Sequence, residues 1–286
     1  MNAVILAAGT SSRFVPHSIE KPKGLIEVKG EILVERQIRQ LQEAGIFDII
    51  MVVGYKFEQF KFLKEKYGVR LVYNEDYYRY NNISSLMRVI DDLNETYICS
   101  SDNYFPENVF LPPKKDSFYS ALYSEGPTEE YCLITDEKDF IVDVTIGGKD
   151  SWYMVKHVYF NNECSSLFRN VMQKEYERDE TRMGYWEDLY IRYIDQLPPL
   201  KVNRYKSHAI EEFDSLDDLR QFDKSYIDNT RSSLIKLICS RHGWKESYLS
   251  NFKRYDSQLH SDAFLFNAGE ERLLYDGGIL TRIDTE

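Results

Sequence analysis

Residues 2–25 of the chain read Asn2-Ala-Val-Ile-Leu-Ala-Ala-Gly-Thr-Ser-Ser-Arg-Phe-Val-Pro-His-Ser-Ile-Glu-Lys-Pro-Lys-Gly-Leu25. Residues 3–7 are a short apolar run, which is typical of a strand buried in a parallel sheet. The run ends at Ala8-Gly9, and the small hydroxylic residues 10–12 follow. Because small side chains let an anion approach backbone N–H groups, this stretch predicts a phosphate-binding turn after the first strand.

Three cations follow this turn closely. Arg13 can clamp a phosphate with its forked donors, and Lys21 and Lys23 flank Pro22, which stiffens the backbone. A strand, a small-residue loop and these cations predict a triphosphate site at the carboxyl end of the strand. The loop is neither a Walker A motif nor G-x-G-x-x-G, so a buried strand with an ordinary surface turn is the alternative. The residues of this stretch expected to contact a nucleotide are Leu6, Ala7, Ala8, Gly9, Thr10, Ser11, Ser12, Arg13 and Lys23.

The stretch also follows a longer pattern. It contains, in this order, Leu6, Ala7, Ala8, Gly9, Arg13, Pro16, Pro22, Lys23 and Leu25. This order resembles the signature of the nucleotidyltransferases that activate sugar phosphates and alcohol phosphates, L-A-A-G-x-G-x-R-x-x-P followed by K-P-K-x-L. Ser11 stands where the signature has its second glycine, which is a departure in the loop. A serine there still offers its backbone N–H and adds a hydroxyl.

The composition bounds the class of protein. The chain has 286 residues, enough for one large domain or for one domain with an appendage. Its 47 Asp and Glu against 36 Lys and Arg give a net charge of −11, which disfavours nucleic acid and anionic membrane surfaces as partners. The four cysteines are widely spaced and indicate neither a zinc site nor a disulfide framework. With no bilayer-length apolar segment and no basic leader, we expect a cytoplasmic protein.

Strand and helix patterns alternate after the first strand and predict a Rossmann-like α/β domain. Such a domain has a mostly parallel sheet flanked by helices, and it binds ligands beyond the carboxyl ends of its strands. Helices are expected at 31–44 and 56–66, and strands at 48–53, 69–73 and 97–104. An antiparallel substrate-binding sub-region follows, with strands at 118–123, 131–135, 140–145 and 151–160. Helices at 161–177 and 181–194, a strand at 200–204 and a helix at 211–220 complete the pattern.

The loop after the third strand carries paired amides and hydroxyls. Asn81 and Asn82 either cap the following helix, with Ser84 and Ser85 in its first turn, or recognise a base or ribose. The bacterial CTP:phosphocholine cytidylyltransferases carry a similar Tyr-Asn-Asn-x-x-Ser-Leu run at residues 80–86 of this chain. This resemblance implies nucleotide contacts by Asn81, Asn82 and Ser85.

Carboxylates at two places are candidate metal ligands. Asp102 ends a buried strand, where it can hold a divalent ion on a triphosphate; an ordinary turn residue is the alternative. Glu187 and Asp188 lie at a helix start, which the helix dipole favours whatever their role. The resemblance implies that Asp102 binds Mg²⁺ and that Glu187, with Asp188 in reserve, supplies the second carboxylate. Ser101, beside Asp102, joins the expected nucleotide contacts.

Aromatic residues make up 14% of the chain, and most of them are expected in the core and in hairpin pairs. Tyr131, Trp152 and Tyr185 stand beside acidic residues at strand and helix ends. They are candidates for an aromatic box, because a quaternary ammonium group binds well against aromatic faces. In the phosphocholine enzymes an aromatic residue that follows an acid matches Tyr131, although tryptophan is the residue associated with that place.

The resemblance covers residues 1–225, since the pattern Phe213-Asp214-Ser215 before a helix also recurs in the family. We therefore divide the chain into a catalytic domain, 1–225, and a C-terminal appendage, 226–286. The appendage is expected to contain an amphipathic helix at 232–241 and a strand pair at 252–266 and 272–275. It weakly resembles the opening of a choline/ethanolamine kinase N-lobe. A packing or dimerising appendage is the preferred interpretation, so a homodimer is considered.

The resemblance implies a magnesium-dependent transfer of CMP from CTP to phosphocholine, with CDP-choline and pyrophosphate as products. Lys23 would hold the α-phosphate and the attacking phosphate, and Arg13 the β- and γ-phosphates. The same transfer to 2-aminoethylphosphonate or to a sugar 1-phosphate is the alternative. An inactive nucleotide-binding scaffold or regulatory module is a hypothesis of another class, motivated by Ser11 and by the kinase-like C-terminal stretch.

Overall fold

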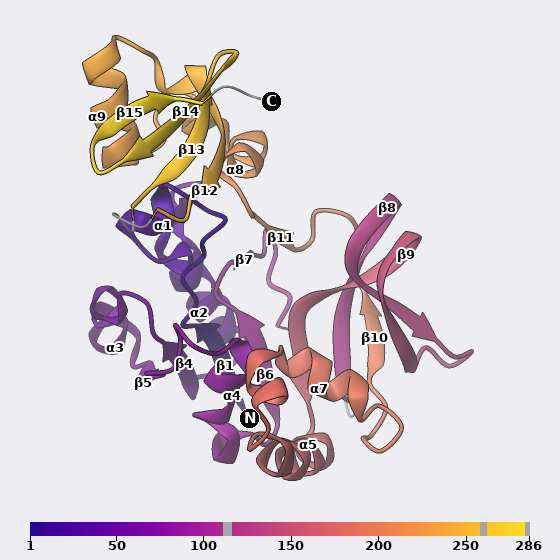
Figure 1. Cartoon of the computed structure of the whole chain (residues 1–286). Coiled ribbons are helices and arrows are strands. Elements are labelled where there is room, and N and C mark those ends of the chain that lie inside the picture. The colour runs from indigo at the N-terminus through magenta and orange to yellow at the C-terminus, as the bar shows by residue number, and fades with distance from the viewer. Residues whose placement is uncertain (111–115, 258–261, 284–286) are drawn as a thin grey trace. The chain divides into compact units, whose positions relative to one another are not determined.

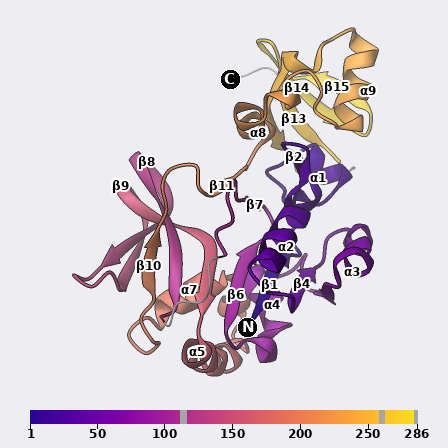
Figure 2. The same cartoon turned by 180° about the vertical axis from the view of Figure 1, so that it is seen from behind.

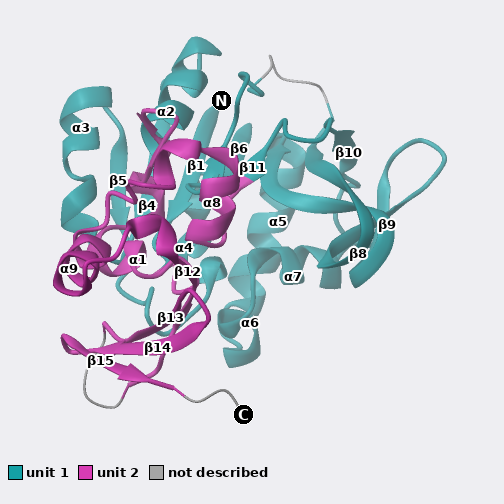
Figure 3. Cartoon of the chain, turned by 90° about the horizontal axis from the view of Figure 1, so that it is seen from above, with its two compact units in different colours: residues 1–9, 34–211 teal, residues 10–33, 212–286 magenta. Residues whose placement is uncertain are grey.

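The computed structural model describes residues 1–110, 116–257 and 262–283. The chain forms two compact units that are interleaved in the sequence (Figure 3). The first unit consists of Met1–Gly9 and Val34–Glu211, and the second of Thr10–Leu33 and Glu212–Glu286. The predicted boundary between residues 225 and 226 divides the chain differently, and it stays a prediction.

A seven-stranded sheet forms the centre of the first unit (Figures 1 and 2). Its strands are β1 (Asn2–Ala7), β4 (Ile49–Val53), β5 (Arg70–Tyr73), β6 (Thr96–Ser100), β8 (Phe118–Thr135), β9 (Ile141–Phe160) and β10 (Lys201–Arg204). Their order is β10-β8-β9-β6-β1-β4-β5. β1 pairs in parallel with β4 and β6, and β4 with β5, whereas β9 runs antiparallel to β6 and β8. The predicted fold class, a Rossmann-like and mostly parallel sheet with an antiparallel sub-region, is confirmed.

Helices flank this sheet and complete the core of the first unit. Buried Leu86, Phe168 and Trp186, from three different helices, pack in one cluster with Val4 of β1 and Ile98 of β6. The remaining elements of the unit are α2 (Leu33–Glu43), η2 (Phe57–Phe60), α3 (Phe62–Tyr67), α4 (Asn82–Met87), η3 (Ile90–Asp92), β7 (Asn103–Tyr104), α5 (Asn162–Glu175), α6 (Asp179–Met183) and α7 (Trp186–Arg192). The helix predicted at 181–194 is two helices, because Gly184 adopts an extended conformation between α6 and α7.

The antiparallel sub-region differs from its prediction. The four strands expected between residues 118 and 160 are two long strands, β8 and β9, of 18 and 20 residues. Gly126 and Gly147 lie inside these strands with φ of +82° and +78°. The register between the strands shifts at several points, including Ser124 to Pro127. Glycine, proline and turn-like residues therefore mark bulges in one hairpin here and do not end strands.

The second unit contains the segment 10–33 and the C-terminal residues. The segment forms α1 (His17–Glu20), η1 (Lys23–Leu25) and the pair β2 (Glu27–Val28) and β3 (Glu31–Ile32). Because Glu31 and Ile32 form β3, α2 begins at Leu33 and not at the predicted residue 31. The short strand β11 (Glu211–Glu212) spans the boundary between the units. The elements after it are α8 (Leu216–Phe222), η4 (Lys224–Tyr226), α9 (Ser233–His242), η5 (Glu246–Tyr248), β12 (Leu249–Arg254), β13 (Phe264–Ala268), β14 (Glu271–Asp276) and β15 (Ile279–Arg282).

The last four strands form an antiparallel sheet in the order β12-β13-β14-β15. Phe252, Phe264, Phe266 and Tyr275 are buried and stack on one another in its core. The helix predicted at 232–241 is present as α9. The predicted strand pair is a four-stranded sheet, and residues 258–261 of the predicted stretch lie outside the described residues.

Two further findings concern the chain as a whole. Within the described residues, no helix combines the length and the apolar character needed to cross a membrane. All four cysteines, Cys99, Cys132, Cys164 and Cys239, are buried free thiols.

His157 of β9 is buried without exposure among aromatic rings of the first unit. Its ring stacks on Tyr97 at 5.7 Å between centroids, and Phe110 meets it edge-on at 5.3 Å. Nδ1 contacts Ser120 Oγ at 2.8 Å, while Nε2 has no hydrogen-bond partner among the described residues. Burial lowers the pKa of this imidazole to about 3, so the ring is neutral in the folded protein.

We predict that His157 makes the fold sensitive to acid. Between pH 6.5, the ordinary histidine value, and about 3, the unfolded chain binds a proton that the folded chain excludes. The free energy of unfolding therefore falls as the pH falls through this window, by at most about 1.4 kcal/mol per pH unit from this group. Urea unfolding from pH 7 to pH 4 should show a shallower fall in His157→Phe. Exposed His208→Gln is the control, and equal slopes in all three proteins would contradict the assignment.

Candidate functional site

The carboxyl ends of β1, β4 and β6 meet at one edge of the sheet. Ser101 N donates to Leu6 O at 3.1 Å, and Tyr55 N donates to Ala8 O at 3.0 Å. Gly54, after β4, lies so close to β1 that a Cβ atom there would be 2.9 Å from the Ala8 carbonyl oxygen. The backbone at the end of β1 is thus held from both sides, with Ser101 beside it, and the nucleotide contacts of these residues stay a prediction.

The next part of the loop, residues 10–12, belongs to the second unit. Ser11 has a φ of +51°, in the left-handed region that glycine adopts most easily. Its carbonyl accepts a hydrogen bond from Phe14 N at 2.9 Å, which closes a turn. A glycine, as in the family signature, would adopt this backbone conformation without strain. Ser11 keeps the conformation, at a cost of about 1 kcal/mol.

The two cations expected at the phosphates have carboxylate partners within the second unit. Lys23 is buried, and its Nζ lies 3.6 Å from Asp214 Oδ1 and 3.9 Å from Glu212 Oε1. Arg13, whose side chain is 73% exposed, contacts Asp214 Oδ2 at 2.9 Å. Asp214 therefore bridges both cations. Asp214 and Glu212 are absent from the predicted site, although the pattern at residues 213–215 was a signal for this place.

The amide and hydroxyl groups after β5 have structural partners in the first unit. Buried Asn74 donates from Nδ2 to Ser84 Oγ at 2.9 Å and to Ser85 Oγ at 3.1 Å. Asn81 is the N-cap of α4, and its Oδ1 accepts a hydrogen bond from Asn82 N at 2.8 Å. Capping, one of the two roles considered for these residues, is therefore observed at Asn81. Nucleotide contacts by Asn81 and Ser85 stay a prediction.

The side chain of Asn82 joins α4 to α7. Its Oδ1 accepts from Trp186 N at 2.9 Å, and its Nδ2 donates to Glu187 Oε2 at 3.2 Å. Both ends of the amide are therefore engaged within the first unit. Asn82 therefore holds Glu187 in place, and its predicted contact with a base or ribose stays a prediction.

Glu187 is a buried carboxylate, 7% exposed. Tyr119 Oη donates to its Oε1 at 3.3 Å, and Lys156 is a nearby positive charge. Burial raises the pKa of Glu187 to about 7, against the opposing effect of these groups and of its other hydrogen bonds. A bound cation would favour the ionised form strongly. The arrangement is therefore suited to a metal ion or to the cationic group of a substrate.

Asp188 lies beside Glu187 and orders two tyrosines. Its Oδ1 accepts from Tyr131 Oη at 2.7 Å, and its Oδ2 accepts from the backbone N of Tyr185 at 2.7 Å. Burial, the hydrogen bond to Asp188 and the negative charge of Glu187 raise the pKa of the Tyr131 hydroxyl. Tyr131 and Tyr185 are thus brought together with both acids, although they are 54 residues apart.

Trp152 has other neighbours in the first unit. Its ring meets Tyr123 edge-on at 5.3 Å, and the Arg204 guanidinium lies over it at 5.4 Å from the centroid. One face of the ring therefore already has a cation. Among the described residues no ring contact joins Trp152 to Tyr131 or Tyr185. The box of three rings stays a prediction, and its best-supported members are the two tyrosines.

Asp102 lies in the turn after β6. Its Oδ1 accepts a hydrogen bond from Ser100 Oγ at 2.5 Å. Within the described parts of the chain, no three His, Cys, Asp or Glu side chains gather into a group that could enclose a metal ion. A magnesium ion on a triphosphate needs only one or two protein carboxylates, because phosphate oxygens and water complete its octahedron. The oxygen chemistry of Asp102 and Glu187 fits such an ion.

Comparison with known proteins places these features in a family. Residues 3–106 match the model of the MobA-like NTP transferase domain. The choline-phosphate cytidylyltransferase of Streptococcus pneumoniae is 35% identical over 224 residues, which cover 78% of this chain and 97% of that protein. The 2-aminoethylphosphonate cytidylyltransferase of Lancefieldella rimae is 34% identical over 235 residues, with 81% and 95% covered.

Solved structures agree with this relationship. The S. pneumoniae CTP:phosphocholine cytidylyltransferase LicC has a TM-score of 0.75 at 34% identity and covers 78% of this chain and 98% of its own. A putative glucose-1-phosphate thymidylyltransferase from Bacillus anthracis, 18% identical with a TM-score of 0.63, shares the fold over 79% of this chain and 94% of its own. The chain therefore belongs to the nucleotidyltransferase family that contains the choline-phosphate cytidylyltransferases.

Proposed function

We propose that this chain transfers CMP from CTP to phosphocholine and releases CDP-choline and pyrophosphate. The observation that carries the proposal is the 35% identity to the pneumococcal choline-phosphate cytidylyltransferase over 97% of that protein. Arg13, Lys23 and Asp102, which the transfer requires, are all present. Their presence argues against an inactive nucleotide-binding scaffold, because a protein that only binds a nucleotide does not need a metal carboxylate.

The transfer exchanges one P–O bond for another. A phosphate oxygen of phosphocholine attacks the α-phosphorus of CTP in line, and the bond from that phosphorus to the pyrophosphate oxygen breaks. Positioning and charge neutralisation carry most of the catalysis. Lys23 holds the α-phosphate and the attacking phosphate together, and Arg13 binds the β- and γ-phosphates. Both cations exchange the Asp214 carboxylate for phosphate oxygens when the nucleotide binds.

Magnesium on the triphosphate would neutralise charge on the departing pyrophosphate. We assign Asp102 and Glu187 as its protein ligands, with Asp188 in reserve. The two hydrogen bonds that Asp188 accepts, each of 2.7 Å, leave it less free than Glu187. The raised pKa of Glu187 also supports a cation there, because a positive charge would keep this buried carboxylate ionised.

The acceptor is assigned from the aromatic and acidic residues near α7. A trimethylammonium group has no N–H to satisfy and binds well to the faces of Tyr131 and Tyr185. A primary ammonium group would need hydrogen-bond acceptors such as Glu187 and Asp188. Because the L. rimae relative is a 2-aminoethylphosphonate cytidylyltransferase, 2-aminoethylphosphonate is the second candidate acceptor.

We also propose that the enzyme works in the cytoplasm on these small molecules. Four free cysteine thiols are consistent with a reducing compartment. The homodimer considered from the sequence stays a prediction.

We predict that pyrophosphate release, measured with four NTPs and several acceptors, is fastest with CTP and phosphocholine. The preference for phosphocholine over phosphoethanolamine should be about 1–2 kcal/mol in kcat/KM, the range of a desolvated cation–π contact. Tyr131→Leu should reduce this preference and leave the KM for CTP unchanged, while exposed Tyr78→Leu serves as the control. A higher kcat/KM for 2-aminoethylphosphonate or for a sugar 1-phosphate would replace phosphocholine as the acceptor. No release with any pair would favour the inactive scaffold.

We predict that Asp102→Ala abolishes turnover while circular dichroism and the unfolding temperature stay close to wild type. The reason is that the triphosphate loses its metal anchor. Exposed Glu137→Ala is the control. Activity above about a tenth of wild-type kcat, equivalent to about 1.4 kcal/mol, would remove Asp102 from the metal site. Glu187→Gln should raise the Mg²⁺ concentration needed for half-maximal activity; if it raises only the KM for phosphocholine, Glu187 binds the acceptor.

We predict that Lys23→Ala lowers kcat more than it raises the KM for CTP. Its ammonium group meets charge that develops at the α-phosphorus in the transition state. Lys23→Arg should rescue only part of the rate, because a planar fork and a point charge differ in shape. Lys236→Ala, at an exposed position of α9 with no assigned role, is the control. A pure KM effect in both Lys23 variants would limit Lys23 to ground-state binding.

A further inference from the structure

We propose that residues 226–286 hold the segment 10–33 in the conformation that aligns Arg13 and Lys23 with the phosphates. Glu20 is the positioning residue through which they do so. The inference rests on the proposed function, because Arg13 and Lys23 belong to this segment. It concerns the second unit alone, which contains both parts.

Glu20 of α1 caps the N-terminus of α9. Its Oε1 accepts from Ser232 Oγ at 2.5 Å and from Leu234 N at 3.1 Å, and its Oε2 accepts from Ser233 N at 2.9 Å. Three donors at the start of a ten-residue helix therefore converge on one carboxylate that is 212 residues away in the sequence. A negative charge at this place is also favoured by the helix dipole.

Two further contacts attach the segment to the residues around 226–230. The buried ring of His17 contacts Thr230 O through Nε2 at 2.6 Å. The hydroxyl of buried Tyr226 donates to Glu27 O at 2.5 Å. The rings of His17 and Tyr226 lie 6.1 Å apart, measured between their centroids. The segment thus shares a small core with the C-terminal residues, on both sides of Lys23.

The segment has little regular structure of its own. α1 has four residues, η1 three, and β2 and β3 two each. Elements this short are not stable alone, because the cost of ordering the backbone, about 1–2 kcal/mol per residue, exceeds what so few local hydrogen bonds return. The contacts from the C-terminal residues are therefore needed to fix the loop that carries Arg13 and Lys23.

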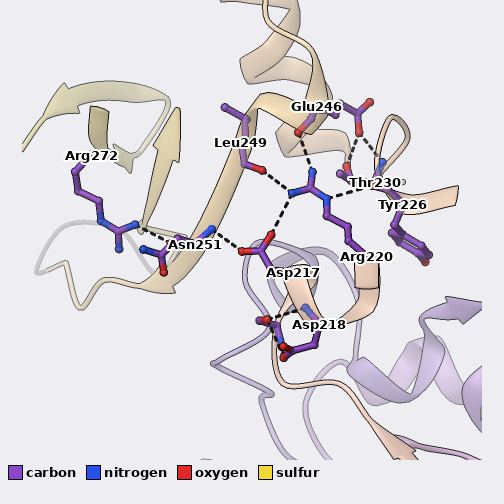
Figure 4. A network of polar contacts seen from close by, with 10 residues as sticks. Asp217, Asp218, Arg220, Tyr226, Thr230, Glu246, Leu249, Asn251 and Arg272 are labelled. Carbon is purple, nitrogen blue, oxygen red and sulfur yellow. Dashed lines mark hydrogen bonds and ion pairs between the residues drawn. The ribbon is translucent and has the colours of Figure 1, made fainter. Parts of the chain in front are cut away.

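The C-terminal side of this attachment is itself braced, as Figure 4 shows. Arg220 of α8 donates to the carbonyl oxygens of Leu249 at 2.5 Å, Glu246 at 2.8 Å and Tyr226 at 3.3 Å. Glu246 in turn accepts from the backbone N and the hydroxyl of Thr230, at 2.6 and 2.5 Å. One guanidinium therefore links α8 to the two residues that contact the segment, Tyr226 and Thr230.

Part of this chain has no counterpart in the pneumococcal relative. The match to the pneumococcal relative spans 224 residues and covers 97% of that protein but 78% of this chain. About a fifth of this chain therefore lies outside the match. The sequence resemblance to the family ends at residue 225, so we infer that the unmatched part is residues 226–286. The contacts of Glu20 and His17 join these residues to the segment that carries Arg13 and Lys23.

The test compares Glu20→Ala and Glu20→Gln in the full chain by steady-state kinetics and by amide hydrogen exchange. Glu20→Ala should raise the KM for CTP about tenfold and lower kcat, because the cations are no longer aligned with the phosphates. The KM for phosphocholine should rise less than the KM for CTP, because only Lys23 of the two cations is assigned to its phosphate. Amides of residues 14–26 should exchange faster, and Glu20→Gln, which keeps the shape and some hydrogen bonds, should lie between Glu20→Ala and wild type.

Asp276→Asn is the control within the same C-terminal sheet, since its carboxylate accepts from Ser257 Oγ and does not belong to the Glu20 cap. It should match wild type in both measurements. Wild-type KM for CTP and unchanged exchange in Glu20→Ala would overturn the inference, as would equal losses with both substrates. Should Glu20→Ala fail to fold, Glu20→Gln and Ser232→Ala decide. Should wild type release no pyrophosphate, the proposed function fails, while the exchange of residues 14–26 still tests the brace.

Discussion

The parallel pairing of β1 with both β4 and β6 is the constraint on which the first unit depends. Leu6 lies opposite Val52 on one side and Ser100 on the other, so the three strands end at nearly the same level. Strands that end together deliver their following loops to one edge of the sheet. The backbone of residues 6–9, Gly54 and the Ser101–Asp102 turn meet there for this reason. A slip of one residue in either pairing would reverse the faces of β1 and separate these groups.

Much of the fold follows from local pattern, and so does part of the site. Apolar runs and helical spacing are local, so they identified the alternating α/β part, and the rule of strand ends then located Ser101 and Asp102. The contacts that sequence spacing could not show are those between distant residues. Asn82 holds Glu187 across 105 positions, and Asp214 bridges two cations near the start of the chain. Such pairs arise only when separate elements pack together.

Backbone conformation was a second limit. The chain has Ser11 where the family signature has a glycine, yet the backbone of Ser11 adopts the left-handed conformation that glycine favours. Likewise, four short strands were predicted between residues 118 and 160, whereas Gly126 and Gly147 lie inside β8 and β9 with positive φ, where the pairing of the strands is irregular. The same residue type permits a turn, a bulge or a loop, and the packing around it decides between them.

Two buried charged side chains, one in each unit, are compensated in different ways. Lys23, with its side chain 8% exposed, is balanced by the carboxylates of Asp214 and Glu212. Glu187, equally buried, accepts hydrogen bonds mainly from neutral groups, and its pKa rises to about 7. Removing an ion from water costs several kcal/mol unless an opposite charge replaces the lost hydration. Lys23 is therefore stable without a ligand, whereas Glu187 gains most when a cation arrives. In the proposed transfer, Lys23 would exchange a carboxylate for a phosphate as its partner, whereas Glu187 would acquire a cation as a new partner.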